Sequence, residues 1–210
     1  MSDGAARARI LERVRKALGD RCPHHHPGSL GPWREAPPDF AAMFTAAGGE
    51  VLRFPSREAA REWLNGFLQG RTASVGRTVP RELRPDAGAA SRKESEAGPA
   101  SEKRPDAGLT SHDRAEVGVS MARCAVAETG SLLLEARDGR RTQLLPPVHV
   151  VFVPEEDVVE TLAEALARTD PDGESAAALH SGPSKSADIG QILVRGVHGP
   201  GRLIAAIIDS

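Results

Sequence analysis

The sequence predicts an α/β fold arranged as a three-layer α/β/α sandwich, and three observations lead to this prediction. Residues 49–75 pass from an extended pattern through a helical one to a second extended pattern. Residues 131–136 and 148–153 are apolar runs without polar alternation, and residues 203–208 form a last such run. Strands that are apolar at nearly every position are typical of parallel sheets that are covered on both faces.

The chain of 210 residues opens with a predicted amphipathic helix and a connecting arm, together residues 1–48. Ile10, Leu11 and Val14 recur at helical spacing, and Gly19 is a typical stop signal. The basic residues on the other face indicate a solvated surface, with a site for an acidic partner as the alternative. Three adjacent histidines follow at 24–26; they lack the spacing of metal ligands and indicate a polar loop.

Residues 50–75 predict a strand, a helix and a second strand. Residues 50–54 are the first strand, and Ser56 is the predicted N-cap of a helix that ends at Gly70. Residues 72–75 are the second strand. A strand–helix–strand unit of this length indicates a parallel sheet. The apolar face of the helix carries Ala60, Trp63, Leu64, Phe67 and Leu68.

Residues 84–108 differ in composition from the rest of the predicted α/β domain, which spans residues 49–210. They contain no Val, Ile, Leu, Met, Phe or Trp, and the pentapeptide Arg-Pro-Asp-Ala-Gly occurs twice, at 84–88 and 104–108. Such a segment has nothing to bury that would offset the entropy lost on ordering. It is therefore expected to be a mobile, disordered surface insertion.

The second half of the chain regains the patterns of regular structure. Residues 131–136 and 148–153 are predicted strands, and Pro154 with the acidic turn 155–157 is expected to start a helix that ends near residue 170. That helix would carry Val158, Val159, Leu162, Ala165 and Leu166. A loop at 181–186 leads to a predicted short helix at 188–194, and residues 203–208 are the last strand.

Composition excludes several classes of protein. The chain is 40% hydrophobic and 27% charged, has a net charge of −2, and contains five Phe, two Trp and no Tyr. Stacking on nucleobases and attraction to nucleic acid are therefore not expected. The N-terminus has no apolar run long enough for a signal peptide or a membrane span, so the protein is expected to be cytoplasmic.

Two isolated cysteines, Cys22 and Cys124, indicate no disulfide framework. They also cannot hold a four-thiolate iron–sulfur cluster within one chain. We therefore expect no cofactor and no metal site in this chain. The motifs of nicotinamide dehydrogenases, P-loop ATPases, serine hydrolases and zinc proteases are also absent from the sequence.

The first candidate loop is residues 127–131, directly before a predicted strand. Thr129, Gly130 and Ser131 offer backbone N–H and hydroxyl donors to an anion, and Glu128 could act as a base, nucleophile or hydrogen-bond acceptor. The alternative is a tight turn in which the hydroxyls only satisfy their own backbone.

The second candidate loop is residues 181–186, running into the predicted helix at 188–194. Lys185 and the N–H groups of the helix N-terminus would favour a phosphate or carboxylate, beside Ser181, Gly182 and Ser184. Alternatively, Ser184 or Ser186 is an ordinary N-cap and Asp188 a favourable first-turn acid, with which an anion would have to compete.

Two histidines are further candidates for ligand binding. His149 lies within an apolar strand, where a hydrogen-bonded core histidine is the alternative. His198 lies in a glycine-rich turn at 196–201. Neither histidine has metal-ligand spacing to another ligand.

Three motifs in this order resemble the LutC/YkgG family of lactate-utilisation proteins, which contain the LUD domain. They are Glu-Val-Gly-Val-Ser with Ala-Val-Ala-Glu-Thr-Gly-Ser (116–131), Pro-Pro-Val-His-Val-Val-Phe-Val (146–153), and Ser-Gly-Pro-Ser with Gly-Val-His-Gly-Pro (181–200). The resemblance covers residues 116–208 well and the earlier chain more loosely. The insertion at 84–108 is peculiar to this chain. Lys185 falls where the family pattern leads us to expect Arg or Lys, and Gly190 falls where it leads us to expect Glu.

The resemblance implies a NagB/RpiA/CoA-transferase-like α/β fold and a role as an accessory subunit in the oxidation of L-lactate to pyruvate. The partners would be iron–sulfur proteins that carry the clusters, and the two loops would bind a small anionic ligand. The rival is a stand-alone enzyme of the same fold acting on a phosphorylated or CoA-linked substrate, with Glu128 as nucleophile or base. A third hypothesis, a nucleotide binder similar to folate cyclo-ligase, depends on fold analogy alone.

Overall fold

The computed structural model describes residues 3–18, 38–86, 91–92, 115–169, 176–187 and 193–209. The chain divides into two compact units, residues 1–36 and residues 37–210, and each is described by itself. The first unit contains α1 (Asp3–Leu18), which is the helix predicted from the apolar spacing. Its apolar residues Ile10, Leu11 and Val14 are exposed.

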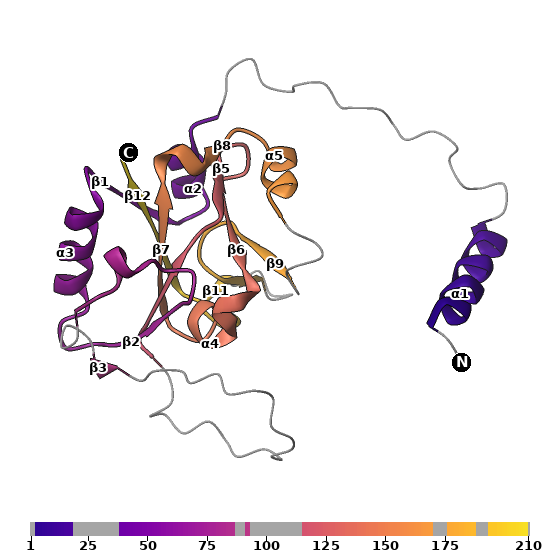
Figure 1. The fold of residues 1–210 in the computed structure, drawn as a ribbon, viewed down its shortest axis with the longest axis horizontal. Helices are drawn as coiled ribbons and strands as arrows, with labels where there is room; N and C mark the ends of the chain where they lie inside the picture. The colour runs from indigo at the N-terminus through magenta and orange to yellow at the C-terminus, as the bar shows by residue number, and fades with distance from the viewer. Residues whose placement is uncertain are drawn as a thin grey trace, which may run out of the picture. The chain divides into compact units, whose positions relative to one another are not determined.

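The second unit is built on a six-stranded parallel sheet, which confirms the predicted α/β class (Figure 1). The predicted strands at 50–54, 72–75, 148–153 and 203–208 all lie in it. Two further strands of this sheet were not predicted. In spatial order the strands are β1 (Glu50–Phe54), β12 (Arg202–Ile208), β7 (Val148–Pro154), β4 (Val117–Met121), β2 (Thr72–Val75) and β3 (Ser91–Arg92).

One face of the sheet is covered by α3 (Arg57–Phe67) and the short 3-10 helix η2 (Arg81–Leu83). Ser56 caps α3 as predicted, because its hydroxyl accepts a 3.2 Å hydrogen bond from the N–H of Ala59. The buried apolar positions of this layer repeat at helical spacing and pack on alternate residues of the sheet. They include Ala60, Leu64, Leu68, Val150, Phe152, Ile204 and Ala206.

The opposite face is covered by α2 (Phe40–Ala46) and by a second, four-stranded sheet, so this layer is not purely helical. The order in the second sheet is β8 (Val158–Val159), β5 (Cys124–Val126), β6 (Ser131–Glu135) and β9 (Ala177–His180). The predicted strand at 131–136 is therefore confirmed as β6, with antiparallel partners. A short helix, α5 (Leu162–Ala167), packs on the outer side of this sheet through Ala165.

Three connecting elements complete the unit. They are the 3-10 helices η4 (Ala136–Asp138) and η5 (Glu155–Asp157) and the helix α4 (Gly139–Gln143). Gly118 of β4 lies so close to α4 that a Cβ there would stand 1.9 Å from the carbonyl oxygen of Thr142. Only glycine allows this approach of helix to strand.

The α/β unit begins earlier than residue 49. Phe40 and Phe44 of α2 are 3% and 0% exposed and belong to the same core as Val151 and Ile207. The rings of Phe40 and Phe44 stack on each other with their centroids 5.3 Å apart. The segment assigned to the connecting arm therefore contributes a helix to the core.

The helix predicted from Pro154 to residue 170 is shorter than expected. Val158 and Val159 form β8 because they pair with Ala125 and Val126 of β5, and the helix starts only after Thr161. The short helix predicted at 188–194 is also wrong where the structure describes it. Residues 193–195 form β11 (Leu193–Arg195), which pairs with β10 (Lys185–Ala187) in an antiparallel hairpin.

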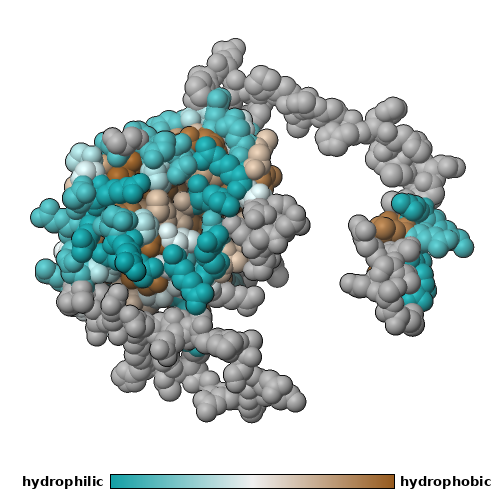
Figure 2. Space-filling view, viewed as in Figure 1, coloured by the Kyte–Doolittle hydropathy of each residue, from teal (hydrophilic) through white to brown (hydrophobic). Residues whose placement is uncertain are grey.

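The start of the predicted insertion is anchored to α3. Asp86 accepts hydrogen bonds from Arg61 and, at 2.7 Å, from the side chain of Asn65. Most of the predicted insertion, residues 87–90 and 93–108, lies outside the described residues. No helix in the described part of the chain is long and apolar enough to cross a membrane. The face shown in Figure 2 is mostly hydrophilic, and its hydrophobic areas are separated by polar side chains.

Candidate functional site

The two loops predicted from the sequence meet at one end of the second sheet. The Oγ1 atom of Thr129 lies 2.7 Å from Oγ of Ser131, which lies 2.5 Å from Oγ of Ser181. The antiparallel pairing of β6 with β9 explains this contact, because Leu132 stands opposite His180 and leaves the preceding and following serines side by side. We call Thr129, Ser131 and Ser181 the hydroxyl chain.

The hydroxyl chain retains an unused donor. Its three hydroxyl groups carry three hydrogens and share two contacts, so one O–H group stays available to an outside acceptor. Ser131 is buried, whereas Thr129 and Ser181 at the two ends are exposed. A ligand can therefore reach the chain from its ends only.

The glycines of both loops are required for close packing on α2. Gly130 has a φ of +57°, and a Cβ there would lie 2.5 Å from the backbone nitrogen of Phe44. Gly182 has a φ of +91°, and its Cβ would lie 2.7 Å from the carbonyl oxygen of Ala47. Both positions exclude a side chain by backbone conformation and by space.

Lys185 lies beside the loop that carries Ser181. Its Nζ atom donates to the carbonyl oxygen of Ala47, the same atom against which Gly182 packs. The ammonium group therefore lies beside Gly182, one residue from the end of the hydroxyl chain. An ammonium group has three donors, so two remain after this bond.

Glu128 points toward α5. Its Oε2 atom accepts a 2.9 Å hydrogen bond from the backbone nitrogen of Leu162, the first residue of the helix. The side chain of Thr161 caps the same terminus through the backbone nitrogen of Glu164, at 3.2 Å. Glu128 thus stabilises the start of α5, and this structural role explains an acid at this position without a catalytic role.

His149 is completely buried between the two sheets. Its Nε2 atom lies 3.0 Å from Oγ of Ser120, and its Nδ1 atom has no hydrogen-bond partner among the described residues. Burial, with a smaller effect of the neighbouring His180, lowers the pKa of His149 to about 3. Burial also lowers the pKa of His180, whose ring centroid lies 6.1 Å away, so both imidazoles are neutral near pH 7.

Ser184 and His198 do not join the hydroxyl chain. Ser184 is held by backbone bonds from its own N–H to Pro200 and from Gly196 to its carbonyl oxygen. His198 is exposed in the turn after β11. Asp188 lies outside the described residues. Residues 185–187 are extended, so no helix begins at Ser184 or Ser186. The loop at 181–186 therefore lacks the helix N-terminal N–H groups that the predicted anion site required.

A second concave feature was missed in the sequence. A cavity of about 620 Å³ lies where the carboxyl ends of β2, β4 and β7 meet the far end of β6. In α/β sheets the crevice at the carboxyl ends of the strands is the usual place for ligands. Its ionisable lining residues are Arg77, Arg123, Glu135, Arg137, Asp157 and Arg168; we call this the arginine cavity.

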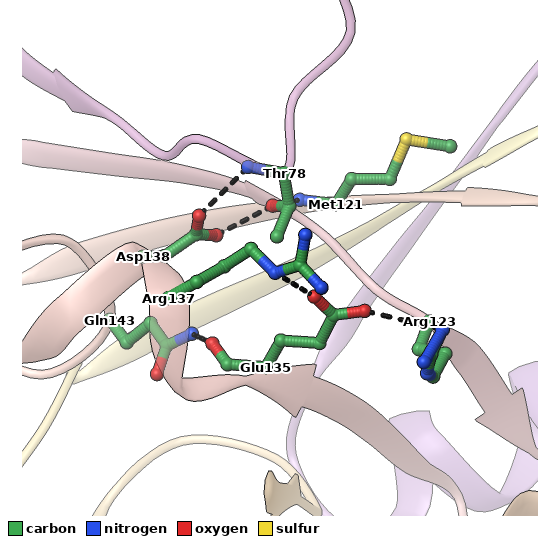
Figure 3. A network of polar contacts seen from close by, with 7 residues as sticks. All are labelled: Thr78, Met121, Arg123, Glu135, Arg137, Asp138 and Gln143. Carbon is green, nitrogen blue, oxygen red and sulfur yellow. Dashed lines mark hydrogen bonds and ion pairs between the residues drawn. The ribbon is translucent and has the colours of Figure 1, made fainter. Parts of the chain in front are cut away.

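Ion pairs organise the wall of the arginine cavity. The carboxylate of Glu135 lies between Arg123, at 3.5 Å, and Arg137 (Figure 3). Arg168 pairs with Asp157 at 2.8 Å. These residues are far apart in the sequence, and the only signal that could have indicated them is that several directly follow a strand.

No group of three His, Cys, Asp or Glu side chains within the described segments has the geometry to hold a metal ion. Cys124 is buried, and burial raises the pKa of its thiol. This thiol is therefore protonated at neutral pH and is not a reactive thiolate.

Comparison with known proteins gives matches over most of the α/β unit. The family model described as LUD domain matches residues 38–208. Lactate utilization protein C from Bacillus pumilus (strain SAFR-032) is 39% identical over 92 residues, which cover 40% of this chain and 38% of that relative. The protein of the same name from Deinococcus radiodurans is 40% identical over 93 residues, covering 40% of this chain and 43% of that relative. The matched stretch thus spans about two fifths of the length of these relatives.

A solved structure has the same fold. The crystal structure of a DUF162 family protein from Deinococcus radiodurans superimposes with a TM-score of 0.57 and 20% sequence identity. The match covers 80% of this chain and 93% of that chain. This likeness supports the α/β fold described above.

Proposed function

This chain belongs to the LUD domain family, and on that premise we propose that it is a LutC-like accessory subunit in the oxidation of L-lactate to pyruvate. Two relatives that match 40% of this chain carry the name Lactate utilization protein C. Iron–sulfur proteins would be its partners and would carry the redox centres. The chain itself would bind a small anionic ligand.

The observation that carries the anion-binding part is the hydroxyl chain beside Lys185. The hydroxyl chain keeps one unused O–H donor, and the ammonium group of Lys185, with two donors left after its bond to Ala47, lies close to Gly182, the residue after Ser181. A carboxylate is acceptor-only when ionised, so it matches a site that offers a cation and a hydroxyl. Lactate and pyruvate both present such a group.

The redox part of the proposal depends on partners. Two cysteines, of which Cys124 is buried, do not supply the four thiolates of an iron–sulfur cluster. Electrons taken from lactate would then pass to clusters on the partner chains. This chain would position the carboxylate or hold the partners together.

Ligand binding is tested by thermal shift with L-lactate and pyruvate. A ligand present at a hundredfold its Kd adds about 2.7 kcal/mol to the free energy of unfolding. Lys185→Met removes the cation and is expected to abolish most of this shift. Lys16→Met, which removes an equal charge from α1, is the matched control and keeps it. Equal shifts in both variants would contradict the assignment of the site.

The partnership is tested in the native cell. The tagged full chain is expected to copurify with cysteine-rich iron–sulfur proteins, and its deletion is expected to slow growth on L-lactate but not on glucose. Normal growth on lactate after deletion, together with the absence of such partners, would refute the accessory role. If a Lys185→Met strain shows the same growth defect as the deletion strain while its protein still copurifies with the partners, the defect comes from lost anion binding rather than from lost assembly.

A further inference from the structure

We propose that the arginine cavity is a second binding site, separate from the hydroxyl chain, for a phosphorylated small molecule with at least two negative charges. Ser131 and Glu135 stand at opposite ends of β6, and the four residue steps along the strand separate them by about 13 Å. The two sites therefore share a strand but not a ligand. This inference does not depend on the proposed function.

The charge of the lining residues favours a dianion. Four arginines and two carboxylates line the cavity, which leaves a formal excess of two positive charges. The carboxylates of Glu135 and Asp157 are each paired with arginines of the wall. Arg77 is exposed, and no hydrogen bond or ion pair joins it to another described residue. A phosphate monoester carries about −1.5 to −2 charges at pH 7, which matches this excess.

Hydrogen bonds join the two turns that carry Arg77 and Arg137. The N–H and hydroxyl of Thr78 donate to the carboxylate of Asp138, at 2.9 and 2.6 Å, and the hydroxyl accepts from the N–H of Met121 at 2.9 Å (Figure 3). Thr78 follows Arg77, and Asp138 follows Arg137, so these bonds join the two turns that carry the arginines. Gly76 permits the contact, because a Cβ there would lie 2.4 Å from Cγ of Asp138.

Holding like charges at one cavity is unfavourable unless something compensates them. Part of the compensation is internal, through Glu135 and Asp157, and the exposed Arg77 is available to a ligand. Arg123 and Arg168 are 30% and 39% exposed, so their guanidinium groups are shielded in part and remain reachable. Guanidinium groups bind phosphate oxygens in a bidentate manner.

The volume favours an organic phosphate over a bare anion. The cavity of about 620 Å³ lies within the range of roughly 300–1,000 Å³ that is usual for small-molecule sites. At about 30 Å³ per water molecule it would hold on the order of twenty waters. Lactate, with six non-hydrogen atoms, would fill a small part of it. A nucleotide or a sugar phosphate has the size and the charge that the cavity offers.

The test is calorimetric titration of the full chain with ADP, pyrophosphate, inorganic phosphate and, as a monocarboxylate, L-lactate. Arg77→Gln is expected to weaken ADP binding about tenfold or more, because it removes a charged donor. Asp157→Asn adds to the positive excess and is expected to tighten binding severalfold. Arg53→Gln is the matched control, since Arg53 is an exposed, ion-paired arginine outside the cavity, and it should leave binding unchanged.

Arg77→Gln and Asp157→Asn are expected to change the affinity for ADP in opposite directions. This distinguishes an effect of local charge from misfolding, because a folding defect does not tighten binding. Higher salt is expected to weaken binding of all phosphate probes. Binding that is equal in Arg77→Gln and Arg53→Gln, or weaker than a Kd of about 1 mM for every phosphate probe, overturns the proposal. ADP that binds no tighter than inorganic phosphate overturns the organic part. Lys185→Met, which tests the hydroxyl chain, should not affect ADP binding.

Discussion

Acid is expected to destabilise this protein, and His149 is the main titrating residue. Its pKa is about 3 in the folded chain, because burial penalises the charged imidazolium, against 6.5 for an ordinary histidine. The unfolded chain therefore binds a proton at this position more readily than the folded one. Stability from His149 is fully present above pH 6.5 and is lost as the pH falls toward 3.

The size of the effect follows from the two pKa values. Between pH 8 and pH 5 the linkage amounts to about 2 kcal/mol, and at pH 4 to about 3 kcal/mol. Native domains are stable by only 5–15 kcal/mol, so a loss of this size is a large fraction of the total. The lowered pKa of His180 acts in the same direction.

The assay is urea unfolding at pH 8, 6.5, 5 and 4, followed by tryptophan fluorescence in a Trp33→Phe background, in which the signal comes from Trp63, packed against Phe67 in the core layer of α3. His149→Gln removes the titrating group and is expected to flatten the loss of unfolding free energy between pH 8 and pH 5 by about 2 kcal/mol. His198→Gln removes an exposed histidine instead and should keep the wild-type slope. The same slope in wild type and His149→Gln would refute the reasoning.

Three further predictions concern the packing around the hydroxyl chain. Gly130→Ala should lower the free energy of unfolding by about 2 kcal/mol or more in urea titrations, because the new Cβ strikes the α2 backbone. Gly70→Ala, with a similar positive φ but nothing within 4 Å, should cost about half as much, and equal losses would contradict the steric cause. Phe44→Ala should lower the free energy of unfolding by about 3–5 kcal/mol in thermal denaturation. Leu166→Ala, on the exposed side of α5, should lower it by under about 1 kcal/mol. A similarly small loss in the Phe44 variant would mean that α2 is not part of the core. Glu128→Ala should cost about 1 kcal/mol and Glu128→Gln less, since an amide oxygen can still accept from Leu162; an equal loss in both would show that the negative charge, not the hydrogen bond, stabilises α5.

Local patterns in the sequence were sufficient for the central strands and for α3. The apolar runs at 148–153 and 203–208 belong to strands buried on both faces, and Ser56 with the spacing of Ala60 and Leu64 defined α3. These signals are local, since burial on both faces and helical periodicity each leave a mark within a few residues. The family resemblance was confirmed by a match to most of the α/β unit.

Where the prediction was wrong, a distant partner decided the outcome. Val158 and Val159 have a composition that suits helix or strand, and pairing with β5 made them β8. Residues 193–195 became β11 because β10 supplied the partner strand. Short apolar segments carry no periodicity that separates the two states, so long-range hydrogen bonding determines which one forms.

The sequence by itself determined the α/β class, the family and the two loops that carry Ser131 and Ser181. Only the tertiary structure joined those loops, through the antiparallel pairing of β6 with β9, and turned Glu128 away from them toward α5. It also gathered the arginine cavity from five separate segments, which no spacing in the sequence connects. The physical reason is the same in each case: side-chain contacts between distant segments depend on strand order and register, and these are properties of the whole sheet.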